Sequence, residues 1–109
     1  MANYKTPPKP ITIDTLRERV NYDPETGYFT RRVAANSRLP AGSRMEKKFT
    51  SGYMIRVKGI DIPLSRAAWW FVTGGKPNGY VVHKNGNKAD ARASNLELVQ
   101  LAHHIEKDL

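Results

Sequence analysis

The sequence predicts a small α+β domain in which short antiparallel strands and helices share one core. Apolar residues recur at i, i+3 and i+7 in Ile13, Leu16 and Val20, which is typical of an amphipathic helix, and Thr12 precedes them as an N-cap. Every second side chain from residue 53 to residue 57 is aromatic or β-branched, which is typical of a half-buried strand. A chain of 109 residues is long enough for one such domain.

The other elements follow from turn residues that separate short apolar segments. In chain order, we expect a turn at 22–27, a strand at 28–33, a long basic loop at 34–49 with an irregular strand near its end, a turn at Lys58 and Gly59, a strand at 60–62, a helix at 64–73 ended by Gly74 and Gly75, a strand at 80–83, a turn at Asn85 and Gly86, a strand at 96–99 and a helix at 101–109. This succession of strands and helices has no internal repeat and no long linker, which predicts a single domain at residues 13–109.

Proline marks the N-terminal segment, and a tryptophan pair marks the expected helix at 64–73. Residues 1–12 include Pro7, Pro8 and Pro10, so we expect an extended arm there rather than a helix. Trp69 and Trp70 are neighbours on the expected helix, where adjacent side chains point about 100° apart. We therefore expect both to pack in the core or a groove rather than to stack on bases.

Charge and composition limit the classes of partner. The chain has 18 Lys and Arg against 10 Asp and Glu, a formal net charge of +8, which favours a polyanion such as DNA as the partner; the alternative is a basic protein that is merely soluble. It has no cysteine, which excludes disulfides and a cysteine-ligated structural zinc site. No apolar run suggests a signal peptide or a membrane span, so we expect a cytoplasmic protein without a membrane partner.

Three polar residues in the C-terminal part are candidates for a catalytic site. His83 ends an expected strand, Asn95 lies twelve residues later, and His104 lies nine residues further on, in the expected last helix. Hydrolysis of a phosphodiester needs a base, a cation for the developing charge and a group that orients the base. Taken singly, each residue also fits a structural role, a histidine in packing and an asparagine in a turn.

Four motifs carry a resemblance to a known family: YDPETGYFT at 22–30, GYMIRV at 52–57, RAAW at 66–69, and HKNGNK at 83–88 followed by Asn95 and Leu96. From about Ile13 onward the chain resembles small phage-type HNH (His-Me finger) endonucleases. The resemblance implies a ββα-metal motif at 80–109, a DNA substrate and, for a bacteriophage protein, the host cytoplasm. It also implies His83 as the general base, Asn95 as its support through an amide hydrogen bond to the imidazole, and His104 as a metal ligand.

Two positions depart from the family pattern. Val82 stands where members usually carry a metal-binding Asp or His, and Ser65 stands where they usually carry His. Asp108 lies four residues after His104 on the same helical face, so these two could hold a divalent ion together. An imidazole beside one carboxylate favours Zn²⁺, Ni²⁺ or Mn²⁺ over Mg²⁺.

Basic residues on the expected strands and around the site are candidates for phosphate contacts. The DNA-binding candidates are Arg31, Arg32, Arg56, Lys58, Arg66, Lys84, Lys88 and Arg92. Two of them, Arg66 and Arg92, could instead form internal salt bridges with Asp90 or Asp61.

Three functions fit these observations. The first is a DNA-binding protein derived from an HNH endonuclease, with metal-dependent cleavage in doubt because of Val82. The second is an active HNH nicking endonuclease, which the set of His83, Asn95 and His104 favours. The third is a phage-encoded protein that uses the same fold to bind and inhibit a host protein.

Overall fold

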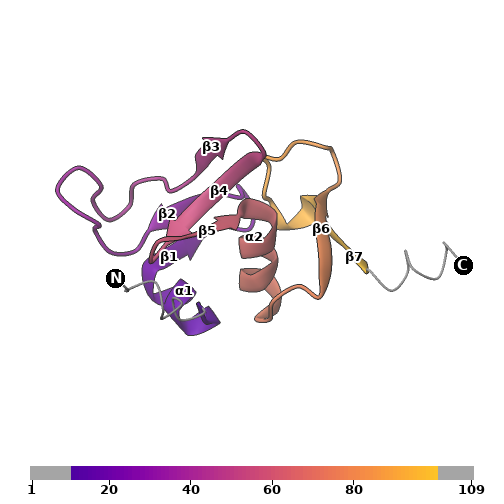
Figure 1. Ribbon diagram of the computed structural model, residues 1–109, viewed down its shortest axis with the longest axis horizontal. Coiled ribbons are helices and arrows are strands. Elements are labelled where there is room, and N and C mark those ends of the chain that lie inside the picture. The colour runs from indigo at the N-terminus through magenta and orange to yellow at the C-terminus, as the bar shows by residue number, and fades with distance from the viewer. Residues whose placement is uncertain (1–10, 101–109) are drawn as a thin grey trace, which may run out of the picture.

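The computed structural model describes residues 11–100 and confirms the predicted α+β class. Three small antiparallel sheets surround the helix α2, which lies between the β3–β4–β5 sheet and the β6–β7 hairpin (Figure 1). The elements are α1 (Ile13–Arg19), β1 (Val20–Tyr22), β2 (Phe29–Arg31), β3 (Lys47–Phe49), β4 (Gly52–Val57), β5 (Ile60–Pro63), α2 (Leu64–Thr73), β6 (Gly79–His83), the 3₁₀ turn η2 (Ala93–Asn95) and β7 (Leu96–Gln100).

Local chemistry explains where the helices and turns lie. The Thr12 hydroxyl accepts a hydrogen bond from the Thr15 amide and caps α1, as predicted. Gly74 ends α2 in the left-handed conformation with φ at 81°. Lys58 and Gly59 have φ values of 52° and 80°, which fits a tight hairpin turn between β4 and β5.

Three short strands, β1, β2 and β3, differ from expectation. Val20, predicted in the helix, begins β1 and pairs with Arg31 of β2, while its side chain stays buried. The strand expected at 28–33 is correspondingly shorter, from Phe29 to Arg31. The end of the basic loop forms β3, a regular strand paired with β4. Three-residue strands have too few positions for a period to be visible in the sequence.

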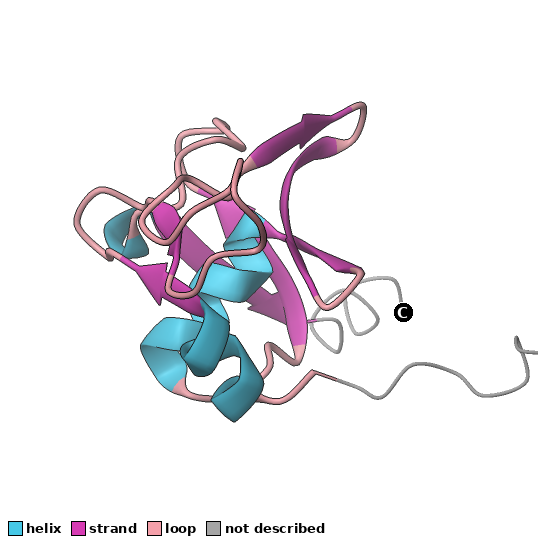
Figure 2. Ribbon diagram, turned by 90° about the vertical axis from the view of Figure 1, so that its left-hand side faces the viewer, coloured by secondary structure: helices cyan, strands magenta, loops and turns pink. Residues whose placement is uncertain are grey.

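The core fills the space between the two helices and the sheets. Phe29, Leu16 and Ile55 are fully buried, and Trp70 is 6% exposed. Trp69 packs against the same core, so the expectation of core packing for both tryptophans is confirmed. The helix α1 contacts α2, and Figure 2 shows the two helices beside each other.

The turn at residues 22–27 holds the segment that precedes β7. The Tyr22 hydroxyl donates to the carbonyl oxygen of Ala91 at 2.6 Å, and the Pro24 carbonyl accepts from the Ala93 amide at 3.0 Å. Burial and the nearby carboxylates Asp23 and Asp90 raise the pKa of Tyr22 to about 12, so the hydroxyl stays a donor at neutral pH. The N-terminal part of the fold therefore positions a C-terminal loop.

The boundaries of the chain are only partly described. Ile11, which we expected in the extended arm, is buried in the core, and Thr12 caps α1. The rest of that arm and the helix expected at 101–109 lie outside the described residues. In the described part, no helix has the length and apolar character that a membrane crossing requires.

Replacing Gly27 by alanine should destabilise the fold by more than strain alone explains. Its φ is +78°, and an added Cβ would lie 2.6 Å from the Arg92 nitrogen and 2.7 Å from the Ala91 carbonyl carbon. The left-handed backbone costs alanine about 1–2 kcal/mol, and overpacking adds about 1–3 kcal/mol. Urea unfolding followed by tryptophan fluorescence measures the loss.

Gly42 supplies the matched control. Its φ is +90°, but nothing lies within 4 Å of an added Cβ, so Gly42→Ala should show the strain cost only. Equal losses in Gly27→Ala and Gly42→Ala would contradict the contact between this turn and the loop.

Candidate functional site

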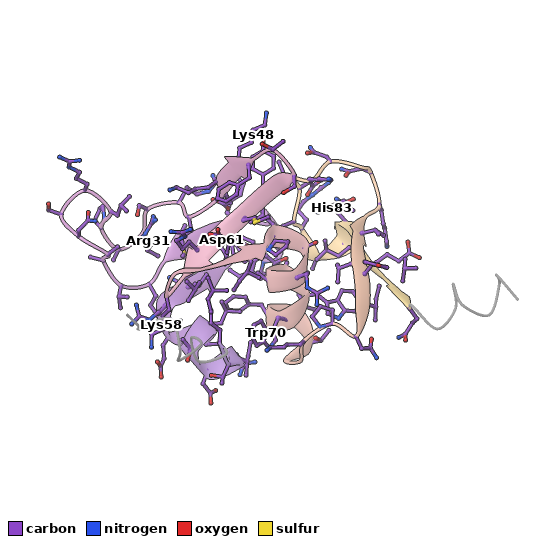
Figure 3. All side chains as sticks on the ribbon, viewed as in Figure 1. Arg31, Lys48, Lys58, Asp61, Trp70 and His83 are labelled. Carbon is purple, nitrogen blue, oxygen red and sulfur yellow. The ribbon has the colours of Figure 1, made fainter. Side chains whose placement is uncertain are left out.

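The candidate site is centred on His83, the last residue of β6. It pairs with Leu96 at the start of β7, so the hairpin brings it beside the loop that joins the two strands. Along β6, Val81 and His83 are half-buried, whereas Tyr80 and Val82 are exposed. In Figure 3, His83 lies at the end of β6 that is close to the start of α2.

One hydrogen bond sets the state of the His83 ring. Nδ1 lies 3.0 Å from the carbonyl oxygen of Asp90. A carbonyl oxygen can only accept, so in the neutral ring Nδ1 carries the hydrogen and Nε2 carries the lone pair. The imidazole is thus oriented as a general base requires.

Asn95 stabilises the loop between β6 and β7 through hydrogen bonds to Asn85 and Asp90. Its side chain is 6% exposed, and Nδ2 donates to the Asp90 carbonyl at 2.9 Å and to Asn85 Oδ1 at 3.0 Å. Its Oδ1 accepts from the Asn85 amide at 3.1 Å. The prediction of a direct hydrogen bond between the Asn95 amide and the His83 imidazole was wrong. Both side chains instead hydrogen-bond to the carbonyl oxygen of Asp90.

Charged and polar groups complete the loop. Arg92 donates twice to the Asp90 carboxylate, at 2.8 and 2.6 Å, and Asn85 Nδ2 donates to it at 2.9 Å. The Arg92 guanidinium holds the pKa of Asp90 well below its ordinary value, so this carboxylate is ionised at neutral pH. Of the two alternatives for Arg92, the internal salt bridge with Asp90 is the one observed.

A cavity of about 490 Å³ opens beside His83. Its walls come from the β3–β4 turn, the first half of β4, the start of α2, the end of β6 and the loop after β6, and include Tyr53, Met54 and Ser65. Lys88 lies at its edge, where Nζ donates to the Ser51 carbonyl at 3.1 Å. The cavity therefore joins a candidate base and a candidate cation in one concave site.

The DNA-binding candidates do not all gather at this cavity. Arg31, Arg56 and Lys58 line a separate pocket of about 140 Å³. Figure 3 shows Arg31 and Lys58 on the opposite side of α2 from His83. Only Lys88 lines the cavity, and Lys84, exposed, follows His83 directly.

Several arginine candidates have partners within the protein. Arg56 makes two hydrogen bonds with Asp61, and Arg32 donates to Asn21. Arg66 donates to the Gly79 carbonyl at 3.0 Å, so it holds the start of β6 rather than pairing with Asp61 or Asp90.

The described residues do not by themselves fit a metal ion. Between residues 11 and 100, no group of three His, Cys, Asp or Glu side chains could hold one. Val82 lies on the exposed face of β6 opposite Glu97, and Asp90 is engaged by Arg92. His104 and Asp108 lie outside the described residues.

Two contributors to the site were not singled out from the sequence. The Asp90 carbonyl has no sequence signal, because every residue offers one. Tyr22 could have been recognised by its place before a Pro and Gly turn, but its hydroxyl contact with Ala91 spans 69 residues.

Asn95→Asp should destabilise the fold although the two side chains have the same shape. The new carboxylate would replace the Nδ2 donor with an acceptor facing the Asp90 carbonyl and Asn85 Oδ1. An unsatisfied or repelled buried group costs about 1–3 kcal/mol, and more when charged. Urea unfolding should show a loss that grows as pH rises and the new carboxyl ionises, while Ser94→Ala, at an exposed neighbour, should be neutral. Wild-type stability in Asn95→Asp would contradict this bonding scheme.

Comparison with known proteins gives one match. The family model described as HNH endonuclease matches residues 63–105, from the end of β5 past β7. No curated protein and no solved structure matches the chain. The matched segment contains His83, its loop and Asn95, which are the residues around which the candidate site is built. Residues 63–105 of this chain are thus similar to the HNH endonuclease family.

Proposed function

We propose that this protein binds DNA through its backbone phosphates and that it cleaves phosphodiester bonds weakly. The observation that carries the proposal is the His83 ring, whose Nδ1 is held by the Asp90 carbonyl beside a cavity edged by Lys88. The family match supports DNA as the partner, and the net charge of +8 supports phosphate contacts.

In this proposal His83 is the base. Its Nε2 takes a proton from a water molecule, whose oxygen attacks the phosphorus while the bond to the leaving oxygen breaks. The Asp90 carbonyl keeps the proton on Nδ1, and Asn95 keeps that carbonyl in place. These residues orient the base, but they do not neutralise the leaving oxygen.

A divalent ion would supply that neutralisation in a cleaving enzyme. We propose His104 and Asp108 as its ligands, with Zn²⁺, Ni²⁺ or Mn²⁺ preferred over Mg²⁺. The aliphatic side chain of Val82 cannot coordinate a metal ion, so the site has one protein ligand fewer than it would with a carboxylate at position 82. This is why we propose weak cleavage alongside DNA binding.

DNA affinity should fall steeply with salt, and the lysines near His83 should account for part of that slope. Each phosphate contact contributes about −0.9 to the slope of log K against log salt. The double variant Lys84→Gln and Lys88→Gln should lower the slope by about one unit per lysine. Fluorescence anisotropy with a labelled duplex at several salt concentrations measures it.

Lys76 provides the matched control. It follows the C-terminal end of α2 and lies over the Trp70 ring at 5.1 Å, whereas Lys88 lies at the N-terminal end of that helix. Lys76→Gln should leave the slope unchanged. A duplex affinity that is undetectable at low salt, or flat as salt rises, would reject DNA binding and leave the host-protein alternative.

Val82→Asp should create a carboxylate that a divalent ion can use. The new side chain would stand opposite Glu97, and like charges in a cross-strand pair are destabilising. Mn²⁺ should therefore raise the melting temperature of Val82→Asp more than that of the wild type, and plasmid nicking should rise with it. Val82→Asn, without the charge, is the control for size and polarity.

His83→Ala separates binding from chemistry in the same assay. It should remove nicking in both the wild-type and the Val82→Asp background while leaving duplex affinity close to its original value. A wild-type protein that nicks efficiently with Mg²⁺ and gains nothing from Val82→Asp would show that weak cleavage is the wrong proposal.

A further inference from the structure

One side of the β3–β4–β5 sheet faces away from the core. Residues directly opposite each other in an antiparallel pair point to the same side, and Lys47 lies opposite Met54 while Arg56 lies opposite Asp61. Alternate residues point to opposite sides, and Ile55, between Met54 and Arg56, is fully buried. We define the outward face as the side of the sheet that carries Lys47, Met54, Arg56 and Asp61.

The outward face connects the cavity beside His83 with the separate pocket of about 140 Å³. Met54 lines the cavity, whereas Arg56 and Lys58 line the pocket at the other end of β4. Figure 1 shows β4 running from the β6 side of the molecule towards β1 and β2. At about 3.3 Å per residue, β4 and the turn after it extend about 20 Å between Gly52 and Lys58. A DNA strand advances about 3.4 Å per base pair, so this length matches about six base pairs.

Positive charge predominates along this face. Four cations line the pocket at its end, and no acidic side chain among residues 11–100 lines it; the four are Arg19, Arg31, Arg56 and Lys58. The strands β3, β4 and β5 contain one acidic residue, Asp61, which accepts two hydrogen bonds from Arg56. Both side chains of that pair are partly exposed, and exposed ion pairs are weak, so a phosphate can compete for Arg56.

Structural roles explain only some of these cations. The strand β3 is an edge of its sheet, and a charge such as that of exposed Lys47 discourages pairing with a strand of another chain. Arg19 lies in the last turn of α1, where a cation complements the helix dipole. Neither reason applies to Lys58, which lies in the β4–β5 turn with φ at 52°, a conformation that favours glycine or asparagine. Lysine at this position is therefore better explained by its charge.

We propose that a nucleic-acid backbone lies along the outward face, from the His83 cavity to the four cations at the far end of β4. That the polyanion is nucleic acid rests on the proposed function, whereas the route along β4 follows from the register and the charges of the sheet. Phosphate contacts fix the register and orientation of a protein on a duplex. Contacts at both ends of β4 would therefore set the direction in which a duplex crosses the His83 ring.

The double variant Lys47→Gln and Lys58→Gln tests the route through the salt dependence of duplex affinity. The slope should fall by about one unit for each lysine that contacts a phosphate. Fluorescence anisotropy with a labelled duplex measures it, with Lys76→Gln as the control lysine. If Lys47 only protects the edge strand, the double variant should aggregate more while its slope stays at the wild-type value.

Asp61→Asn should strengthen DNA binding, a result that loss of folding cannot imitate. The variant frees Arg56 and removes the one carboxylate of the three strands, so affinity at low salt should rise about two- to fivefold. Glu25→Gln, at an exposed residue of the turn at 22–27, makes the same change in net charge and should leave affinity nearly unchanged. Equal effects of the two variants would show that only net charge matters, and would overturn the route.

A cross-link locates the backbone directly. The chain has no cysteine, so one introduced thiol carries a photo-crosslinker at a single position. Val33 lines the pocket with the four cations, whereas Val72 lies on α2, and the two are 49% and 54% exposed. Val33→Cys should cross-link to a bound duplex, and Val72→Cys should not.

The outcomes separate this route from the proposed function. A wild-type protein that binds no duplex at low salt would reject the proposed function and the route with it. Binding that depends on Lys84 and Lys88, but ignores the sheet variants and gives no cross-link at Val33, would keep the proposed function and reject the route alone. A lower slope, a tighter Asp61→Asn complex and a cross-link at Val33 would together establish the route.

Discussion

The carbonyl oxygen of Asp90 is the acceptor on which the rest of the site depends. It accepts one hydrogen bond from His83 Nδ1 and another from Asn95 Nδ2, at 3.0 and 2.9 Å. Because a carbonyl oxygen has two lone pairs, both bonds can form together and each fixes the position of the other donor. The tautomer of the ring, the shape of the loop and the direction of Nε2 all follow from this one atom. The side chain of Asp90 strengthens the arrangement, since Arg92 and Asn85 hold its carboxylate.

The N-terminal part of the chain supports this loop more than it extends the site. The Tyr22 hydroxyl, the Pro24 carbonyl and the Gly27 backbone all contact residues 91–93. The Tyr22 ring in turn stacks on Phe71 of α2 at 5.6 Å and lies 4.8 Å from Phe29, so the loop is tied to the core. The strands β1 and β2 therefore support a segment that is distant in the sequence: Tyr22 and Ala91 are 69 residues apart.

Sequence periodicity predicted the elements that are long enough to show a period. The helix α2, the cap at Thr12 and the β4–β5 turn at Lys58 and Gly59 were predicted because each depends on neighbouring residues. The spacing of His83 and Asn95 predicted that the two residues lie close together. It did not predict how they are linked, because the group between them is the backbone carbonyl of Asp90. The partner of Arg92 stayed open for a similar reason: Asp90 and Asp61 are equally acidic, and only the loop geometry selects Asp90.

The same geometry divides the basic residues into two groups with different consequences for DNA. Many arginines serve the fold: Arg31 donates to Ser43, Arg56 to Asp61, Arg66 to Gly79 and Arg92 to Asp90. The cations next to His83 are lysines, Lys84 and Lys88. An arginine can read guanine through two parallel hydrogen bonds, whereas a lysine acts as a flexible point charge on phosphate. Near His83, Arg66 and Arg92 already bond to Gly79 and Asp90, so lysines are the cations that remain for contacts with phosphates. If the protein binds DNA as proposed, we therefore expect recognition to depend little on base sequence.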